Sequence, residues 1–320
     1  MNLLANERSG SNVSNPIPII DFQPFIMGNL QTQKAVAIKL ERAMREVGCF
    51  YLTNTAVSLK QVAQVFTFCQ YFFALPQEEK EQLLMPPDGS YHGYIVKRQE
   101  ETIINEKLSI TLGLLQNPVE EVRDRRSQWF EEHPELCEPL SRAYQSFQKT
   151  VEIVFRAMAI ALDAPQDYFT KLHGQQNDSM LLHHYPVLHP TLASNVLRNK
   201  EHIDYGSLSL LFQDEIGGLE VCTQAGDWIA VPPIENTPIT ILGNIMSRWT
   251  NDKYPGTKHR VSMPTTQHAM KERYSFGLFP APDDRAAIAC LETCLAPNEK
   301  PKYLPISTHD YYERGFQAKL

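Results

Sequence analysis

The 320-residue sequence has no apolar run long enough to cross a bilayer. Lys, Asp or Gln interrupts its apolar stretches within about ten residues, whereas a spanning helix needs roughly 18 to 20. The sequence also lacks a basic cluster, since 37 Asp and Glu outnumber 30 Lys and Arg and the formal net charge is -7. A surface that neutralises nucleic-acid phosphates is therefore not expected. These absences exclude a membrane span and make nucleic acid a poor candidate partner.

Cysteine is scarce, and its six positions show no CxxC spacing. A chain of this length can bury a large core without disulfide staples, so reduced thiols are expected. Residues 1–16 are rich in Asn and Ser and lack the apolar segment of a secretory signal. We therefore expect a flexible N-terminal arm over 1–16 and a cytoplasmic protein.

The first half of the sequence is typical of helices with a few short strands. Apolar residues at helical spacing predict helices over 31–47, from Ser58 towards Pro76, and over 135–162. Short apolar runs predict strands at 17–22 and 49–52. The Pro-rich stretch around 86–89 predicts an irregular loop that leads into residues 91–94.

After Asp178 the pattern changes to short apolar segments with turn residues about every ten positions. Such spacing predicts an antiparallel barrel or sandwich. Residues 208–213 and 218–222 are predicted to form a hairpin, followed by a strand at 228–231. We expect the chemistry in this strand-rich half.

A candidate metal site lies in this half. His202 and Asp204 are two residues apart, so on an extended strand both side chains point to one face. His259 is the best third ligand. Two His and one carboxylate form the facial set of non-haem Fe(II) oxygenases. The His-x-Asp pattern alone is a weak signal, because a charged face or a satisfied core histidine explains it equally well.

The surrounding motifs strengthen this interpretation. The sequence resembles the isopenicillin N synthase-like branch of the 2-oxoglutarate/Fe(II)-dependent oxygenases. The resemblance covers nearly the whole chain, and it rests on these segments in order: 17–21, 48–51, 202–214, 217–221, 228–233, 248–251, 259–261 and 272–275.

The resemblance implies an α+β fold, in which N-terminal helices support a double-stranded β-helix (jelly-roll, cupin-like) core. It divides the chain into the arm at 1–16, a helical and β region at 17–175, the jelly-roll core at 176–285 and a C-terminal helical segment at 286–320. It also implies an Fe(II) enzyme that uses O2 and 2-oxoglutarate, with ascorbate as the in vitro reductant. Hydroxylation, desaturation or ring closure of a small metabolite would accompany decarboxylation to succinate and CO2. Halogenation is disfavoured, because halogenating members lack the carboxylate found here at Asp204.

The resemblance also assigns residues to 2-oxoglutarate. Arg273 and Ser275 match the Arg-x-Ser element that grips its distal carboxylate, and an Arg fork suits a carboxylate physically. Tyr185 matches a tyrosine that donates a hydrogen bond to the same end. His183 stands where the family often has Asn, and its charge is expected to vary near pH 6 to 7. Gly243-Asn244 replaces the family's Gly-Asp pair, which is expected to change only a turn.

The primary substrate is expected between the metal and the irregular region near residue 91, and ordinary core packing is the alternative role for each suggested wall residue. The segment 311–316 is expected to be helical and to act as a lid. A small-molecule partner and a monomer or weak homo-oligomer are expected. The suggested substrate-pocket residues are Tyr91, His92, Tyr94, Ile95, Leu210, Phe212, Phe276 and Phe279.

Three other functions stay open. An oxidase of the same fold could use Arg273 to hold the carboxylate of its own substrate and consume no 2-oxoglutarate. A non-catalytic module could bind a small molecule without turnover, although the complete ligand set argues against this. A zinc hydrolase could use the same three ligands, but no general base lies adjacent in the sequence.

Overall fold

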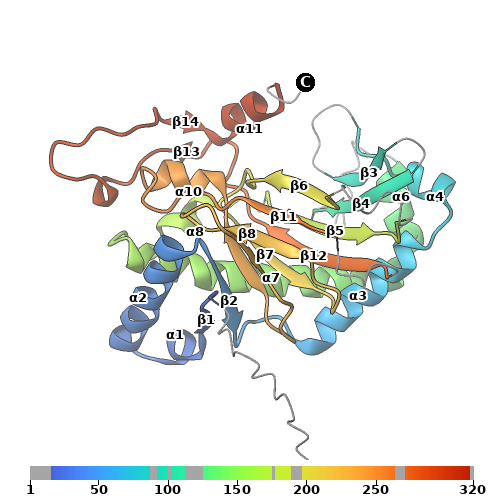
Figure 1. Ribbon diagram of the computed structural model, residues 1–320, viewed down its shortest axis with the longest axis horizontal. Helices are drawn as coiled ribbons and strands as arrows, with labels where there is room; N and C mark the ends of the chain where they lie inside the picture. The colour runs from blue at the N-terminus through green and yellow to red at the C-terminus, as the bar shows by residue number, and fades with distance from the viewer. Residues whose placement is uncertain are drawn as a thin grey trace, which may run out of the picture.

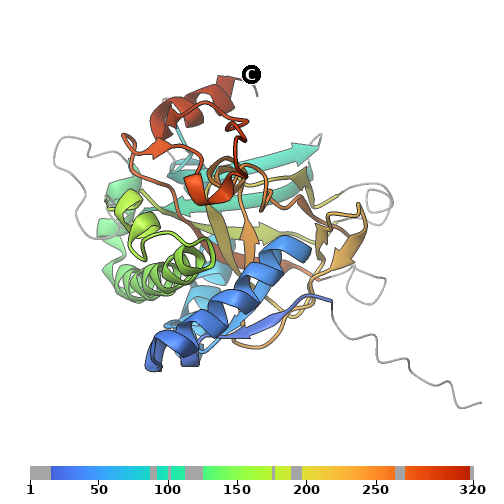
Figure 2. The same cartoon turned by 90° about the vertical axis from the view of Figure 1, so that its left-hand side faces the viewer.

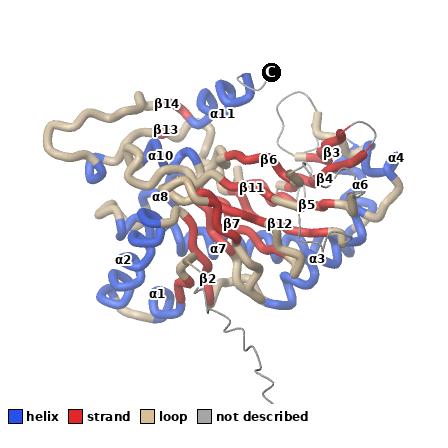
Figure 3. Tube along the Cα trace, in the orientation of Figure 1, coloured by secondary structure: helices blue, strands red, loops and turns tan. Residues whose placement is uncertain are grey.

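The computed structural model describes residues 16–86, 92–99, 102–111, 125–174, 177–188, 197–263 and 271–317. A large sheet of eight strands runs through the centre of the molecule, and helices cover one of its faces (Figures 1 and 3). Its strand order is β1-β2-β10-β7-β12-β5-β4-β3. A second sheet has the order β6-β11-β8-β9. The expected α+β architecture with a jelly-roll core is confirmed.

The strands of the large sheet are β1 (Ile19–Asp21), β2 (Cys49–Thr53), β3 (Gly93–Gln99), β4 (Thr102–Ile110), β5 (Ser179–Tyr185), β7 (Leu208–Gln213), β10 (Ile239–Leu242) and β12 (Arg273–Phe279). The second sheet contains β6 (Asn199–His202), β8 (Leu219–Cys222), β9 (Trp228–Ala230) and β11 (His259–Val261). The short strands β13 (Ala287–Ile288) and β14 (Ile306–Ser307) pair with each other. Pairing is antiparallel except between β1 and β2.

The helices are α1 (Gln23–Met27), α2 (Leu30–Glu46), α3 (Leu59–Phe73), α4 (Gln77–Glu81), α6 (Arg125–Glu132), α7 (Pro134–Ala161), α8 (Tyr168–Leu172), α10 (Asn244–Trp249), the 3-10 turn η2 (Glu292–Cys294) and α11 (Thr308–Gln317). The three long helices predicted from the sequence are confirmed as α2, α3 and α7. Ser58 caps α3 through a capping box with Gln61, as its position predicted. In the described residues, no helix is both long and apolar enough to span a membrane.

Two apolar clusters hold these layers together. The larger cluster lies between the large sheet and helices α2, α3 and α7, and α2 and α3 each pack against α7 (Figures 1 and 2). Phe147 of α7 packs edge-on against Phe212 of β7 and Phe276 of β12. The smaller cluster lies between the two sheets and includes Tyr185, Leu219 and Val221. The space between the sheets is therefore apolar except where the site residues enter it.

The predicted hairpin over 208–222 is wrong. β7 pairs with β10 and β12 in the large sheet, whereas β8 pairs with β9 and β11 in the second sheet. Gly217 and Gly218 both have positive φ, which turns the chain from one sheet to the other. The Asp214 side chain accepts hydrogen bonds from the backbone N–H groups of Ile216 and Tyr274, and so fixes this crossing.

The β3–β4 hairpin was not predicted from the sequence. Both strands extend the large sheet beyond β5, and β4 pairs with β5 over most of its length. The chain from Gly93 onward is therefore regular sheet and not irregular, whereas the loop predicted around 86–89 lies almost entirely outside the described residues.

Candidate metal and co-substrate site

Strand pairing brings the two predicted histidine ligands together. His202 is the last residue of β6 and pairs directly with His259 of β11. Asp204 lies just beyond the end of β6, so its carboxylate is placed by the turn that follows and not by the strand itself. Ser209 of β7 donates a hydrogen bond to that carboxylate. One ligand atom from each of His202, Asp204 and His259 lies within 4.8 Å of the other two.

The two imidazoles present the same nitrogen to Asp204. Nε2 of His202 lies 3.5 Å from Asp204 Oδ1, and Nε2 of His259 lies 3.6 Å from Oδ2. Their Nδ1 atoms lie 2.8 Å and 3.1 Å from the carbonyl oxygens of Lys200 and Thr257. A carbonyl can only accept, so each Nδ1 carries the hydrogen and each Nε2 has a free lone pair. This donor chemistry fits a divalent metal ion.

The electrostatics keep the carboxylate ionised. Burial alone would raise the pKa of Asp204, but His259, His202 and the Ser209 hydroxyl outweigh burial and hold the pKa well below its usual range. Burial lowers the pKa of His259, although the nearby Asp204 opposes the shift. An anionic carboxylate beside a neutral imidazole is the protonation state that binds metal.

Arg273, at the start of β12, is only 2% exposed. Several contacts hold its guanidinium group in a fixed orientation. Nη1 donates to Ser275 Oγ at 3.0 Å, Nη2 donates to Gln213 Oε1 at 2.9 Å, and Nε donates to the carbonyl of Gly217. The guanidinium also stacks 4.8 Å from the Tyr185 ring centre. Nη1 and Nη2 each retain a second N–H, and the described residues offer Arg273 no carboxylate partner. A guest carboxylate fits this fork.

His183 and Tyr185 complete the same wall from β5. Ser275 pairs with His183, and Arg273 pairs with Tyr185, so these side chains share one face of the sheet. His183 Nδ1 lies 3.3 Å from the Tyr185 hydroxyl, whereas its buried Nε2 has no hydrogen-bond partner. Burial, with Lys107 and Arg273 nearby, lowers the pKa of His183 well below 6.5. The expected change of charge near pH 6 to 7 is wrong, because His183 is already neutral there.

One cavity joins the metal-ligand set to these residues, so the structure brings together all seven residues predicted for metal and 2-oxoglutarate. Sequence reasoning assigned no role to several other lining residues, although side-chain alternation along the strands of both sheets could have identified them once the register was known. Those residues are Lys107, Leu181, Asn199, Leu211, Gln213, Leu219 and Val261.

The suggested substrate-pocket residues fall into three groups. Phe279 lines the cavity, and Ile95 pairs with Lys107 on the same face of the sheet. Leu210, Phe212 and Phe276 instead lie in the core against the helices, and Tyr94 is buried in contact with Glu106. His92 does not line the cavity, and Tyr91 lies outside the described residues. Neighbours along a strand alternate between faces, so proximity in sequence did not reveal that Tyr94, Leu210, Phe212 and Phe276 face the core instead of the cavity.

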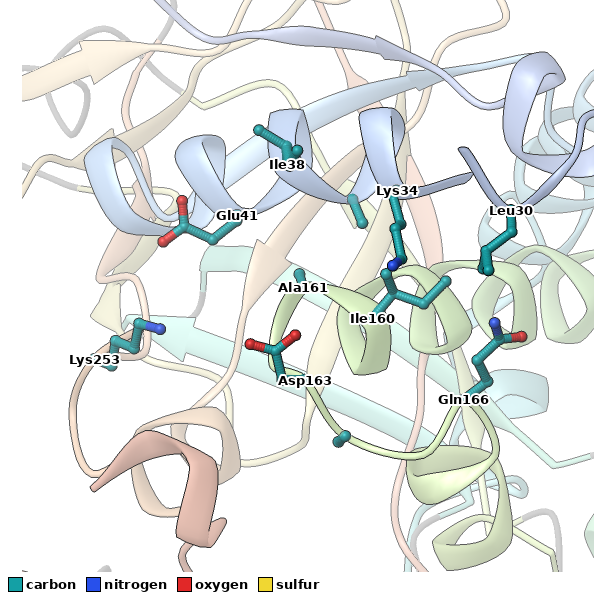
Figure 4. Close-up of a pocket in the computed structure, with 11 residues that line it drawn as sticks. Leu30, Lys34, Ile38, Glu41, Ile160, Ala161, Asp163, Gln166 and Lys253 are labelled. Atoms are coloured by element: carbon teal, nitrogen blue, oxygen red, sulfur yellow. The ribbon is translucent and has the colours of Figure 1, made fainter. Parts of the chain in front are cut away.

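A wider surface hollow lies elsewhere, between α2 and the C-terminal end of α7 (Figure 4). Its lining combines apolar side chains such as Ile38 and Ile160 with Lys34, Glu41 and Asp163. No set of metal-ligating groups converges there among the described residues. The cavity between the sheets is therefore the candidate site.

Comparison with known proteins agrees with this geometry. Residues 17–135 match the model for the N-terminal region of the non-haem dioxygenase in morphine synthesis, and residues 176–282 match that of the 2OG-Fe(II) oxygenase superfamily. The proline hydroxylase buaE of Petromyces alliaceus is 31% identical over 301 residues, covering 89% of this chain and 93% of the relative. The 2-oxoglutarate-Fe(II) type oxidoreductase ppzD of Metarhizium rileyi is 29% identical, covering 91% of this chain and 88% of that protein.

A solved structure shows the same arrangement over nearly the whole chain. It is the crystal structure of a full-length Neurospora crassa protein in complex with alpha-KG and 5-formyluracil, and it superposes with a TM-score of 0.83 at 26% identity. The match covers 94% of this chain and 96% of that chain.

Proposed function

The chain belongs to the 2-oxoglutarate/Fe(II)-dependent oxygenase superfamily, and we propose that it hydroxylates an unactivated C–H bond of a small-molecule metabolite. It is an Fe(II)- and 2-oxoglutarate-dependent oxygenase. The observation that carries the proposal is the meeting of two sets of residues in one cavity. The metal-ligand set and the guanidinium group of Arg273 line the same cavity. The ligands of that set are His202, Asp204 and His259. The name of the hydroxylase relative from Petromyces alliaceus supports hydroxylation over desaturation.

In this proposal His202, Asp204 and His259 hold Fe(II) through two Nε2 atoms and one carboxylate. The bound iron and 2-oxoglutarate supply the oxidising power, because decarboxylation to succinate and CO2 is coupled to the reduction of O2. The carbonyls of Lys200 and Thr257 keep both rings in the metal-binding tautomer.

The remaining residues position 2-oxoglutarate. The N–H groups of Arg273 bind its distal carboxylate in a fork, and the hydroxyls of Ser275 and Tyr185 donate to the same group. Neutral His183 offers a further hydrogen bond through Nε2, which otherwise has no partner. Leu181, Leu211 and other apolar residues of the lining exclude water from the reacting groups.

The experiment is a metabolite screen with purified protein, Fe(II), ascorbate and 2-oxoglutarate, which reads succinate release above the uncoupled background. Asp204→Ala and His259→Ala should each abolish turnover and weaken metal binding while the far-UV circular dichroism stays unchanged. His309→Ala, which removes an exposed imidazole from α11, is the matched control and should keep full activity. Normal activity in Asp204→Ala would sink the assignment. O2 uptake without succinate would indicate the oxidase alternative.

The division of the chain at residues 175 and 285, the lid role of the C-terminal segment, the cytoplasmic location and the monomeric or weakly homo-oligomeric state stay predictions from the sequence. Contacts of α11 support the lid, because the Tyr311 hydroxyl donates to the carbonyl of Tyr205, next to Asp204. The Tyr205 hydroxyl in turn donates to the carbonyl of Gly315.

A further inference from the structure

Asp204 stands in the bend over 203–207, which joins β6 to β7 and belongs to neither strand. We propose that Tyr311 of the C-terminal helix α11 is a positioning residue for this metal ligand, and that Asn244 directs the Tyr311 hydroxyl to the bend. Docking of α11 then sets the affinity of the site for its metal ion. The inference rests on the proposed function, because it assigns a means of controlling the metal site named there.

Three backbone anchors of the bend come from the start of α10. The shortest joins the N–H of Asn244 to the carbonyl of Asp204 at 2.7 Å. A Cβ atom on Gly243 would lie 2.1 Å from the Gly206 carbonyl oxygen, so only glycine lets the two segments approach this closely. The other two anchors also run from N–H to carbonyl, and they join Gly243 to Ser207 and Ile245 to Gly206.

The carbonyl of Tyr205 lies between these anchored groups, and its partner comes from α11, near the C-terminus (Figure 1). The Tyr311 hydroxyl donates to it at 3.2 Å. In the opposite direction, the Tyr205 hydroxyl donates to the carbonyl of Gly315 at 3.2 Å. A Cβ atom on Gly315 would lie 2.5 Å from the Tyr205 ring, so α11 packs directly on the bend. The C-terminal helix therefore adds a fourth carbonyl anchor, one residue from the metal ligand.

The amide of Asn244 determines which way the Tyr311 hydroxyl donates. A carbonyl can only accept, so the single hydroxyl hydrogen of Tyr311 is used in the bond to Tyr205. The hydroxyl oxygen can then accept, and Nδ2 of Asn244 donates to it at 3.0 Å. A carboxylate at position 244 could only accept, and it would compete for that hydrogen as a stronger, charge-assisted partner. The Asn side chain is therefore matched to the tyrosine at 311.

The environment of Tyr311 suits a fixed donor. The residue is 8% exposed, and burial raises its pKa to about 12, so the hydroxyl keeps its hydrogen at neutral pH. The guanidinium carbon of Arg248 lies 5.8 Å from the Tyr311 ring centre. The same guanidinium lies 4.8 Å from the ring of Tyr303, whose hydroxyl donates to Asp252 and not to the bend. The two tyrosines thus share an arginine neighbour and differ in what their hydroxyls hold.

Loss of this anchor should weaken metal binding without removing a ligand. Binding requires the Asp204 carboxylate close to the imidazoles of His202 and His259. If the bend also populates other conformations, the affinity falls in proportion to the fraction that is competent to bind. The net contribution of one neutral hydrogen bond corresponds to a change of about threefold to tenfold in affinity.

The test measures Mn(II) binding by the full-length protein without turnover, from the loss of the electron paramagnetic resonance signal of free Mn(II). Tyr311→Phe should weaken Mn(II) binding about threefold to tenfold. Tyr303→Phe is the matched control, because it also removes a hydroxyl beside Arg248 but leaves the bend untouched. It should bind Mn(II) within about twofold of wild type.

A double-mutant cycle tests the direction of the hydrogen bond. Asn244→Asp adds a negative charge, whose direct effect on a cation is the same whether or not residue 311 carries a hydroxyl. The new carboxylate can draw a hydroxyl away from Tyr205 only where that hydroxyl is present. Asn244→Asp should therefore be less favourable for Mn(II) binding, by about threefold or more, in the wild-type background than in Tyr311→Phe.

Three results would overturn the inference: wild-type Mn(II) affinity in Tyr311→Phe, an equal loss in Tyr303→Phe, or the same effect of Asn244→Asp in both backgrounds. Asp204→Ala separates these results from a failure of the proposed function. If Asp204→Ala abolishes Mn(II) binding while Tyr311→Phe binds as wild type does, the metal site stands and the role of α11 falls. A wild-type protein that binds no Mn(II), or an Asp204→Ala variant that binds it normally, would overturn both.

Discussion

Replacing Glu106 by Leu should strongly destabilise the protein, because this carboxylate is the centre of a buried polar cluster. Glu106 is 2% exposed in β4. Its Oε2 accepts hydrogen bonds from Lys80 Nζ at 2.8 Å and from the Tyr94 hydroxyl, and its Oε1 lies 2.7 Å from His184 Nδ1. Lys80, in α4, is itself only 5% exposed and also donates to the carbonyl of Phe73.

The magnitude follows from what the substitution leaves behind. Glu106→Leu leaves the Lys80 ammonium buried without a counter-charge, and breaking a buried ion pair in this way costs about 3–5 kcal/mol. The double variant Lys80→Met/Glu106→Leu removes both charges and replaces them with apolar groups. It should therefore lose less, about 1–2 kcal/mol, because His184 and Tyr94 still lose a partner.

The contribution of Glu106 should also depend on pH. Burial raises the pKa of its carboxyl, but hydrogen bonds from His184, Lys80 and Tyr94 outweigh burial and lower the pKa below the ordinary 4.5. An acid with a lowered folded-state pKa stabilises the fold above its unfolded-state pKa and loses that contribution as the pH falls. The difference between wild type and Glu106→Leu should therefore be full at pH 7 and shrink below about pH 4.5.

Urea unfolding, followed by circular dichroism, measures these free energies. The control is Glu46→Leu, because Glu46 pairs with Arg42 on the surface, where the two side chains are 45% and 73% exposed. This change should cost less than about 1 kcal/mol. A Glu106→Leu variant within about 1 kcal/mol of wild type, or a double variant less stable than the single one, would refute the buried-charge reasoning.

Two further predictions concern single groups. Arg273→Leu should raise the 2-oxoglutarate concentration needed for turnover by about a hundredfold or more, because the guanidinium group binds the distal carboxylate. The affinity for Fe(II) should change little. Isothermal titration with each ligand checks this, and equal losses of affinity for both ligands would contradict it. Asp178→Asn should stabilise the fold at pH 8 by at most about 3 kcal/mol and have almost no effect below about pH 4, because burial raises the Asp178 pKa from 3.8 to about 6. Above pH 6 the wild-type carboxylate is buried and charged, whereas the Asn amide stays neutral and can still accept from the Ala281 N–H; urea unfolding at both pH values tests the sign, and equal effects at both would refute it.

The metal ligands could be predicted from the sequence because their spacing depends on local geometry. His202 and Asp204 are close in sequence, and His259 follows in a recognisable motif, so no long-range register was needed to group them. The position of Asp204 beyond the end of β6 was not predictable in this way. It depends on Ser209, which belongs to a strand of the other sheet.

The β3–β4 hairpin was not predicted because β4 contains buried polar and charged residues. They break the alternation of apolar and polar residues by which a strand is recognised in a sequence. Asn105, Glu106 and Lys107 interrupt the apolar alternation of β4, so the segment does not look like a central strand. Glu106 can be buried only because Lys80 arrives from a helix 26 residues earlier in the chain. No local pattern contains that information. Similarly, Gly217 and Gly218 indicated a turn but not that the chain would change sheets there.

Side chains alternate between the two faces of β4 and β5, so these strands carry cavity residues on one face and the buried polar cluster of Glu106 on the other. Lys107 and His183 face the cavity, whereas their neighbours Glu106 and His184 pair with each other on the helical face. Loss of Glu106 should therefore loosen the two strands that carry Lys107 and His183 and weaken ligand binding without removing a ligand contact. Such a variant should weaken the binding of Fe(II) and 2-oxoglutarate together, whereas Arg273→Leu should weaken the binding of 2-oxoglutarate alone. Ligand selectivity, rather than affinity alone, thus distinguishes a binding group from the framework that holds it.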